Sequence, residues 1–204
     1  MDKPSAQYHL VKNKGRFRNA LLKWFQVNAK SYPWRETVDP WAILVSEIML
    51  QQTTVASVLA NHRFERFLQE FPNIEAIADA PEEKLLRAWE GLGYYNRVRN
   101  LQKAAQTVLD NYEGRFPSDP KALETLPGIG RYTAGAVSSF AFDRPAPIVD
   151  GNIARVLSRL LDYHKEVDST EGQKVIWNTA TEILDTSKAR LFNSALMELG
   201  QTIC

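Results

Sequence analysis

The sequence holds a single cysteine, Cys204, among 204 residues, and this excludes a disulfide within the chain. It has no apolar run near the roughly 18 residues that cross a bilayer, and its first residues have no apolar signal-peptide core. No segment alternates apolar and polar residues over the length of a β-strand, and there is no repeat or low-complexity tract. These absences predict a cytoplasmic protein, with no membrane partner and no β-sheet.

A strong charge of one sign is also missing. The net charge is +1, so binding to nucleic acid would depend on basic residues placed locally. Such residues gather near the start and in the middle of the chain: Lys12, Lys14, Arg16, Arg18, Arg97, Arg99, Lys103 and Arg131. For any one of them, a solvated helix face is the simpler explanation.

The sequence does contain apolar residues at a period near 3.6, bounded by capping residues, prolines and glycines. Asp39-Pro40 and Asp119-Pro120, for example, combine an N-cap acid with proline in the first turn. The predicted helices are 15–29, 41–50, 54–70, 74–78, 81–89, 94–112, one beginning at Asp119, 132–142, 153–161, 171–184 and 189–200. The fold class predicted is therefore all-α.

The pentapeptide Leu-Pro-Gly-Ile-Gly at 126–130 ends one helical pattern and opens the next. Gly128 and Gly130 can adopt positive φ or bring bare backbone against a ligand. Unpaired N–H groups at such a turn suit one phosphate of a nucleic-acid backbone, and Arg131 adds a cation. An ordinary turn between two helices explains the pentapeptide equally well.

About twenty residues after this turn comes Val-Asp-Gly-Asn, with Asp150 and Asn152. The combination resembles the helix-hairpin-helix and the Gly/Pro-Asp loop of the DNA glycosylases related to endonuclease III. In that superfamily the hairpin holds a DNA phosphate and the Asp lies in the active site. Asp150 is the matching residue, although a helix-capping Asp is the simpler alternative.

Glu47 lies within an apolar helical pattern, with Ile43, Leu44 and Leu50 as helical neighbours. A carboxylate in such a setting must be paired, or its pKa rises through desolvation. A raised pKa is what a general acid requires. The alternative is a buried glutamate satisfied by a neighbouring backbone group or arginine.

The strings SEIMLQQTT (46–54) and WEGLGYY (89–95), followed by R-x-RNL (97–101), closely resemble the catalytic domain of MutY-type adenine DNA glycosylases. The resemblance runs from about 31 to 204. It implies a two-lobed helix-hairpin-helix glycosylase fold: a six-helix barrel domain over 39–154, with the hairpin at about 119–142, and a second lobe from 1–38 and 155–204.

The resemblance also implies roles for catalytic residues. Glu47 would protonate the adenine leaving group and later help to activate water, and Asp150 would stabilise the positive charge that develops on the sugar. Tyr132 and Asn152 would shape this site. Lyase-type relatives have a lysine where this chain has Tyr132, so no Schiff base can form there, and a monofunctional glycosylase is expected.

The implied partner is double-stranded DNA with adenine opposite 8-oxoguanine or guanine, bound by a monomer. Gln52, Leu92 and Tyr94 match residues that fill or wedge the base stack, although Tyr94 could equally be a core or capping aromatic. The remaining implied DNA contacts are Trp34, Arg35, Thr53, Gly128, Gly130 and Arg131.

Cys204 matches the first of four cysteines that hold a 4Fe–4S cluster in the family, and the other three are absent. We therefore expect either that the chain is a fragment of a longer, cluster-containing protein or that Cys204 is a bystander. The domain that recognises 8-oxoguanine in longer relatives is also missing from the sequence.

Three alternatives remain. A thymine glycosylase that acts opposite guanine is compatible with Tyr132, although Gln51-Gln52 and 91–95 favour adenine. An endonuclease III type glycosylase with lyase activity is disfavoured by Tyr132. A non-catalytic module could use the hairpin only to hold DNA.

Overall fold

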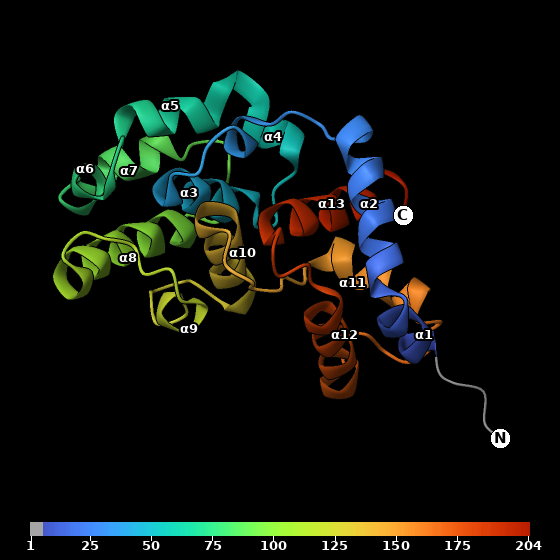
Figure 1. The fold of residues 1–204 in the computed structure, drawn as a ribbon. Helices are drawn as coiled ribbons and strands as arrows, with labels where there is room; N and C mark the ends of the chain where they lie inside the picture. Colours follow the sequence, from blue (N-terminus) through green and yellow to red (C-terminus); the bar gives the residue numbers. More distant parts are fainter. Residues whose placement is uncertain (1–5) are drawn as a thin grey trace. The chain divides into compact units, whose positions relative to one another are not determined.

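A computed structural model describes residues 6–204, except for the side chain of Tyr8, and Figure 1 shows it as a ribbon. Within that range every regular element is a helix, which confirms the all-α prediction. Packing divides the chain into two compact units. We call 31–142 the continuous unit, and 6–30 with 143–204 the discontinuous unit.

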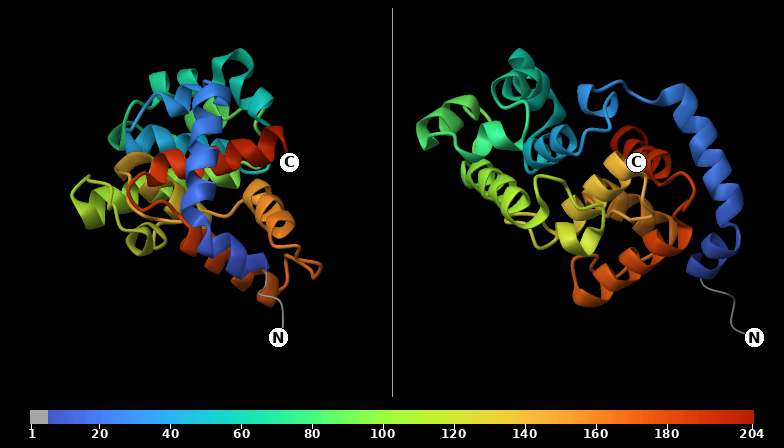
Figure 2. Two further views of the ribbon diagram at one scale, coloured as in Figure 1. Left: turned by 45° about the vertical axis from the view of Figure 1, so that its right-hand side comes forward. Right: turned by 60° about the vertical axis from the view of Figure 1, so that its left-hand side comes forward.

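The continuous unit is a set of short helices around one apolar core, with α8 packed against α6 and α3 against α10 (Figure 2). Its elements are η1 (Pro33–Arg35), α3 (Pro40–Leu50), α4 (Val55–Leu59), η2 (Ala60–His62), α5 (Arg63–Glu70), α6 (Ile74–Ala78), α7 (Glu82–Ala88), α8 (Asn96–Tyr112), α9 (Pro120–Leu123) and α10 (Arg131–Phe142).

Helix α3 lies in the core of this unit, with every residue from Trp41 to Met49 buried. Its start follows the predicted signals: the Asp39 carboxylate accepts hydrogen bonds from the Trp41 and Ala42 amides, at 3.1 and 3.3 Å. The Trp41 indole N–H donates to the Phe71 carbonyl, at 2.9 Å. This apolar helix is buried on all sides, and two contacts hold it in place: the Asp39 cap at its N-terminus and the hydrogen bond from Trp41 to Phe71.

The single helix predicted over 54–70 was wrong, because the chain breaks into α4, η2 and α5. Asn61 and His62 both adopt positive φ, at 54° and 52°. The Arg63 guanidinium stabilises the break by donating to the Ser57 carbonyl, at 2.6 Å. The periodicity hid the break because buried residues on both sides of it face the same core.

The discontinuous unit is built from α1 (Ala6–Lys12), α2 (Lys14–Asn28), α11 (Gly151–Leu160), α12 (Thr170–Ile183) and α13 (Ala189–Thr202). Helix α13 packs against both α2 and α11 (Figure 1). Phe17 on α2 meets Phe192 on α13 edge to face, with ring centroids 6.3 Å apart. Two segments distant in sequence therefore share one core.

Two elements, α1 and η1, were not predicted from periodicity, because each is too short to show it. The units change over at residues 30–31 and 142–143, so Asp150 lies in the discontinuous unit. The lobe bounds implied by the resemblance (1–38 with 155–204, and 39–154) stay a prediction, and their first five residues lie outside the described residues.

Candidate active site

Glu47 is placed by the buried helix α3, and its side chain is only 5% exposed. The residues on either side of it, Ser46 and Ile48, are buried too. A carboxyl group in such surroundings is shielded from water, and burial disfavours its charged form. The position therefore suits a group that delivers a proton.

The turn after α3 carries two of the residues expected at DNA. Gln52 is exposed and adopts positive φ (53°). Gln51 is anchored in the continuous unit through its amide, which donates to the Thr133 hydroxyl at 3.4 Å. Thr53 is half-buried and its hydroxyl donates to the Gln51 carbonyl at 3.3 Å. The turn thus projects one polar side chain while its neighbours hold it in place.

A second turn, 91–95, combines two glycines at positive φ with a tyrosine in the same region. Gly91, Gly93 and Tyr94 have φ of 82°, 68° and 47°. Tyr94 is 65% exposed, whereas Leu92 is buried in the core at 5%. Of the two, only Tyr94 presents its side chain to solvent, as a wedge would.

The two turns meet in one hollow of about 320 Å³. Its lining consists of Gln51, Gln52, Tyr94, Tyr95, Asn96, Arg97 and Arg99. Residues of three sequence motifs therefore line one hollow: the glutamine pair, the two tyrosines of WEGLGYY and the R-x-R motif.

The hairpin turn packs closely on α8. Gly128 has φ 77°, and a Cβ there would lie 2.7 Å from the Cβ of Asn100. Only glycine tolerates both the positive φ and the close approach of the Asn100 side chain. The Ile129 amide closes the turn on the Leu126 carbonyl at 3.1 Å, and α10 begins at Arg131. Gly130 and Arg131 are exposed and Tyr132 is half-buried at this helix start, where amides favour an anion.

Asp150 is the N-cap of α11, and both of its carboxylate oxygens accept hydrogen bonds. One accepts from the Ile153 amide at 2.8 Å, and the other from the Asn152 side-chain amide at 2.9 Å. Asn152 in turn accepts from the Arg155 guanidinium at 2.8 Å, and Arg155 also donates to the Gly200 carbonyl at 2.6 Å. This relay fixes the orientation of the carboxylate.

The segment leading to Asp150 is itself held on α13. The Asp143 carboxylate accepts from the Arg190 amide at 2.8 Å, and the Asn193 side chain donates to the Ala146 carbonyl at 2.9 Å. Gly200 lets α13 approach: a Cβ there would lie 2.7 Å from the Cβ of Asn152. The aspartate is therefore supported from both sides of its turn.

Trp34 and Arg35 lie in η1, beside an aromatic cluster of the continuous unit. Trp34 stacks on Tyr32 with centroids 5.2 Å apart and meets Phe64 edge to face at 5.6 Å. The Arg35 guanidinium lies 4.8 Å from the Tyr32 ring centre. Both side chains lie against aromatic rings.

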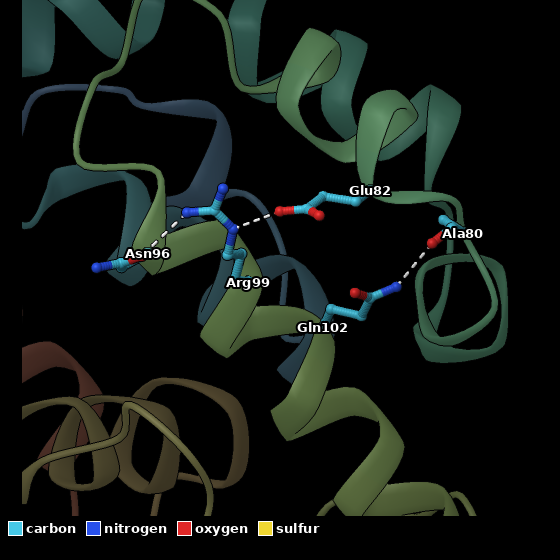
Figure 3. A network of polar contacts seen from close by, with 5 residues as sticks. All are labelled: Ala80, Glu82, Asn96, Arg99 and Gln102. Atoms are coloured by element: carbon cyan, nitrogen blue, oxygen red, sulfur yellow. Dashed lines mark hydrogen bonds and ion pairs between the residues drawn. The ribbon is translucent and has the colours of Figure 1, made fainter.

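Several basic residues have structural partners. Arg18 donates to the Ile183 carbonyl at 2.8 Å and to that of Leu184, at the end of α12. Lys14 donates to the Glu182 carbonyl at 3.3 Å. Arg99 pairs with Glu82 at 2.6 Å and donates to Asn96 at 3.0 Å, as Figure 3 shows. Helix capping and ion pairing thus account for part of the basic clustering.

Cys204 follows α13, and its thiol lies 3.1 Å from the Arg159 guanidinium. No group of three or more potential metal ligands occurs among the residues that the structure describes. One thiolate cannot supply the four ligands of a 4Fe–4S cluster. The residues of this chain therefore do not fit that cluster by themselves.

Two functional candidates were missed by sequence reasoning. Arg97 was noted as one of several basic residues and as part of the R-x-RNL motif, but no role was assigned to it, and Arg155 was not noted. Arg155 lies three residues after Asn152, on the same helix face, and this spacing was the available signal.

Within residues 6–204 no helix is both long and apolar enough to cross a membrane.

Comparison with known proteins agrees with this geometry. The profile described as "HhH-GPD superfamily base excision DNA repair protein" matches residues 45–181. The adenine DNA glycosylase of Mus musculus is 39% identical over 97% of this chain and 40% of its own length. That of Buchnera aphidicola subsp. Baizongia pistaciae is 38% identical over 92% of this chain and 53% of its own. The chain thus spans about half or less of these curated relatives.

Solved structures give the same picture. A thermostable thymine-DNA glycosylase is similar with a TM-score of 0.84 and 31% identity, over 95% of this chain and 88% of that one. An endonuclease III in a non-covalent complex with DNA is similar with a TM-score of 0.76 and 28% identity, over 94% and 87%. These likenesses confirm the predicted glycosylase fold, and with a profile match over more than half of its length the chain belongs to the HhH-GPD superfamily of base excision DNA repair proteins.

Proposed function

We propose that this chain is the catalytic part of a monofunctional adenine DNA glycosylase, which hydrolyses the N-glycosidic bond of adenine opposite 8-oxoguanine or guanine. The observation that carries the reaction class is the contrast between two carboxyl groups. Glu47 is buried at 5% exposure in an apolar helix, whereas Asp150 is held by two hydrogen-bond donors. Such a pair suits an acid kept protonated and a partner kept ionised.

The choice of base rests on the relatives. Adenine DNA glycosylases of mouse, rat and human are 37–39% identical to this chain in sequence, and the alignments cover 97–98% of its length. The Gln51-Gln52 pair and the turn at 91–95 are the residues of this chain that favour adenine over thymine.

In the proposed reaction, the Glu47 carboxyl protonates adenine, at N7, as the bond between C1′ and N9 breaks. The bonding electrons leave with the base. The Asp150 carboxylate stabilises the positive charge on the sugar, in an orientation fixed by Asn152. Water then adds to C1′ and gives its proton to Glu47, which restores the acid. General acid catalysis of this kind accelerates a reaction roughly 10²- to 10⁴-fold.

Tyr132 supports a hydrolase without lyase activity. It lies in the first turn of the second hairpin helix and supplies no amine for a Schiff base. Tyr132 and Asn152 would shape the pocket around the sugar.

DNA would be held by backbone amides of the hairpin, from Gly128 to Arg131, on one phosphate. The target base must leave the stack at a cost of a few kcal/mol. Tyr94, with Gln52, would fill the space beside the opposite base, whereas Leu92, which was also expected there, is buried in the core. Trp34, Arg35 and Thr53 would lie near that base and its backbone.

Finer points of the proposal concern the cofactor, the oligomeric state and the location. A 4Fe–4S cluster with Cys204 as its first ligand would require three cysteines from elsewhere. We further propose a monomer that binds double-stranded DNA and acts in the bacterial cytoplasm, where the genome lies.

A thymine glycosylase is the second candidate. The likeness to a thymine-DNA glycosylase structure, at 31% identity over 88% of that chain, favours it. A non-catalytic DNA-binding module and a glycosylase with lyase activity remain as other outcomes of the same test.

The test is single-turnover base release from four duplexes: adenine opposite 8-oxoguanine, adenine opposite guanine, thymine opposite guanine, and matched DNA. Circular dichroism on the same sample establishes that it is folded. The expected result is adenine release without strand cleavage and no trapping by borohydride on abasic DNA. Thymine release, borohydride trapping, or binding without release would each support the corresponding alternative.

A further inference from the structure

Arg97, in the first turn of α8, is the most heavily hydrogen-bonded side chain beside the hollow. Its guanidinium reaches six oxygen atoms on two segments of the chain. Nη1 donates to the Ile48 and Met49 carbonyls, each at 3.0 Å, and to that of Gln51. The carbonyls of the last turn of a helix have no partner within the helix. Arg97 therefore caps the C-terminus of the helix that carries Glu47.

The other amino group faces the second turn. Nη2 donates to the Leu92 carbonyl at 2.7 Å, to the Gly93 carbonyl at 3.1 Å and to the Thr53 hydroxyl at 3.1 Å. One planar group thus joins the turn after α3 to the turn at 91–95. A planar fork with donors on two sides can do this, whereas the point charge of a lysine cannot.

The cation is also held between two rings. Its central carbon lies 5.5 Å from the ring centre of Trp89, which is buried, and 5.6 Å from that of Tyr94, which is exposed. Burial lowers the pKa of Arg97, and the nearby Tyr94 opposes that shift. Its contacts are carbonyls, a hydroxyl and rings, which is the environment of a structural cation and not of one that awaits a phosphate.

Both joined turns contain a residue in a costly conformation. Gln52 and Tyr94 are not glycines, yet both adopt positive φ, at 53° and 47°. Such residues persist only where the surroundings fix them. Each lies next to a residue whose oxygen is bound by Arg97: Gln51 and Thr53 flank Gln52, and Gly93 precedes Tyr94.

We infer that Arg97 is a positioning residue that fixes Gln52 and Tyr94 as one rigid pair for insertion into DNA and aligns them with the end of the Glu47 helix. The insertion itself rests on the proposed function. The coupling between the two turns does not, because it can be measured on the protein without DNA.

The first test is amide hydrogen exchange on the DNA-free chain, comparing the wild type with Arg97→Lys. The lysine keeps the positive charge but lacks the planar guanidinium group with donors on two sides. We expect exchange in peptides covering 48–54 and 90–96 to become at least about tenfold faster in both turns together, as local opening becomes easier. Arg87→Lys is the matched control, because Arg87 is an exposed arginine whose contact is Glu83 on its own helix. Unchanged exchange in either turn of Arg97→Lys would overturn the inference.

The second test uses DNA with 2-aminopurine beside the base opposite the target. We expect Arg97→Lys to lose most of the fluorescence change that reports insertion. The single-turnover rate should fall about 10- to 100-fold, as misplacement of reacting groups predicts. In Arg97→Gln, which removes the charge, the slope of log affinity against log salt should stay the same as in the wild type, since a lost phosphate contact would reduce it by about 0.9. A reduced slope would mean that Arg97 binds a phosphate directly and is not a positioning residue.

If Arg97→Lys does not fold, Thr53→Val gives a milder version: it keeps the side-chain shape and removes one of the six hydrogen bonds of Arg97, together with the bond from Thr53 to the Gln51 carbonyl. Exchange should then rise less, but in both turns, and a rise confined to 48–54 would show that the turns are not coupled. Failure of the wild type to release any base would count against the proposed function alone and leave the exchange result intact.

Discussion

The two carboxyl groups of the proposed site are prepared in opposite ways. Glu47 lies on a helix whose residues from Trp41 to Met49 are all buried. Asp150 lies at a helix start, where the Ile153 backbone amide donates to one of its oxygens and the Asn152 side chain, itself held by Arg155, donates to the other. Burial favours a neutral acid and hydrogen-bond donors favour an anion. The two carboxyl groups thus differ in local structure, as the proposed reaction requires.

The largest effect should come from removing the acid. Glu47→Gln keeps the size of the side chain in the core and removes the proton that it would deliver. We expect excision to fall by at least about 10³-fold, with DNA affinity within about threefold of the wild type. Single-turnover base release measures the excision rate, and fluorescence anisotropy measures the DNA affinity. Retained turnover would mean that apolar burial of Glu47 serves packing only.

Asp150→Asn tests the ionised partner. The amide oxygen can still accept from the Ile153 amide, so the helix cap survives while the negative charge is lost. We expect the excision rate to fall about 10²- to 10³-fold, and the melting temperature to change by only a few degrees. A rate loss below tenfold in a folded variant would reduce Asp150 to a helix cap.

The relay behind Asp150 can be tested as a double-mutant cycle. Asn152→Ala and Arg155→Met should each lower the excision rate about tenfold, because each releases one carboxylate oxygen from its donor chain. If Arg155 acts through Asn152, the double variant should be no slower than the worse single variant. Independent, multiplying losses would show that the two residues support the site by separate routes.

The smallest effect concerns the approach of α13 to α11. Gly200→Ala would bring a Cβ within 2.8 Å of the Asn152 carbonyl oxygen, and we expect it to destabilise the chain by about 1–3 kcal/mol. Gly15→Ala is the matched control: it lies in helix α2 with nothing near its Cβ position, and should stabilise by about 0.5–1 kcal/mol. Denaturant unfolding measures both, and equal shifts would mean that the close approach contributes nothing.

Local features of the fold could be predicted from the sequence. Aspartate and proline at 39–40 and 119–120 begin helices, as expected, because a cap acts within a few residues. The break between α4 and α5 could not be predicted, since Asn61 and His62 are ordinary polar residues whose positive φ leaves the apolar pattern undisturbed.

The site was predictable at the level of side chains and not of backbone partners. Glu47 and Asp150 were identified from an apolar helix and from a resemblance, and their joint role stays a prediction. The bonds of Arg97 to carbonyls at Ile48 and Met49 span nearly fifty residues. Every residue has a carbonyl group, so no sequence pattern marks the carbonyl that a distant guanidinium will bind.

The division of the chain into a continuous and a discontinuous unit also has a consequence for synthesis on the ribosome. All of 31–142, with Glu47, Arg97 and the hairpin, is complete once Phe142 has been added. The unit that holds Asp150 needs helices α11, α12 and α13 as partners for 6–30, and these appear only during the following 62 residues (204 − 142). The early segment 6–30 must wait while residues 31–204 are added, which at about 5–20 residues per second takes roughly 9 to 35 seconds. A nascent chain at that stage would expose the apolar face of α2, which makes it a natural client for a chaperone.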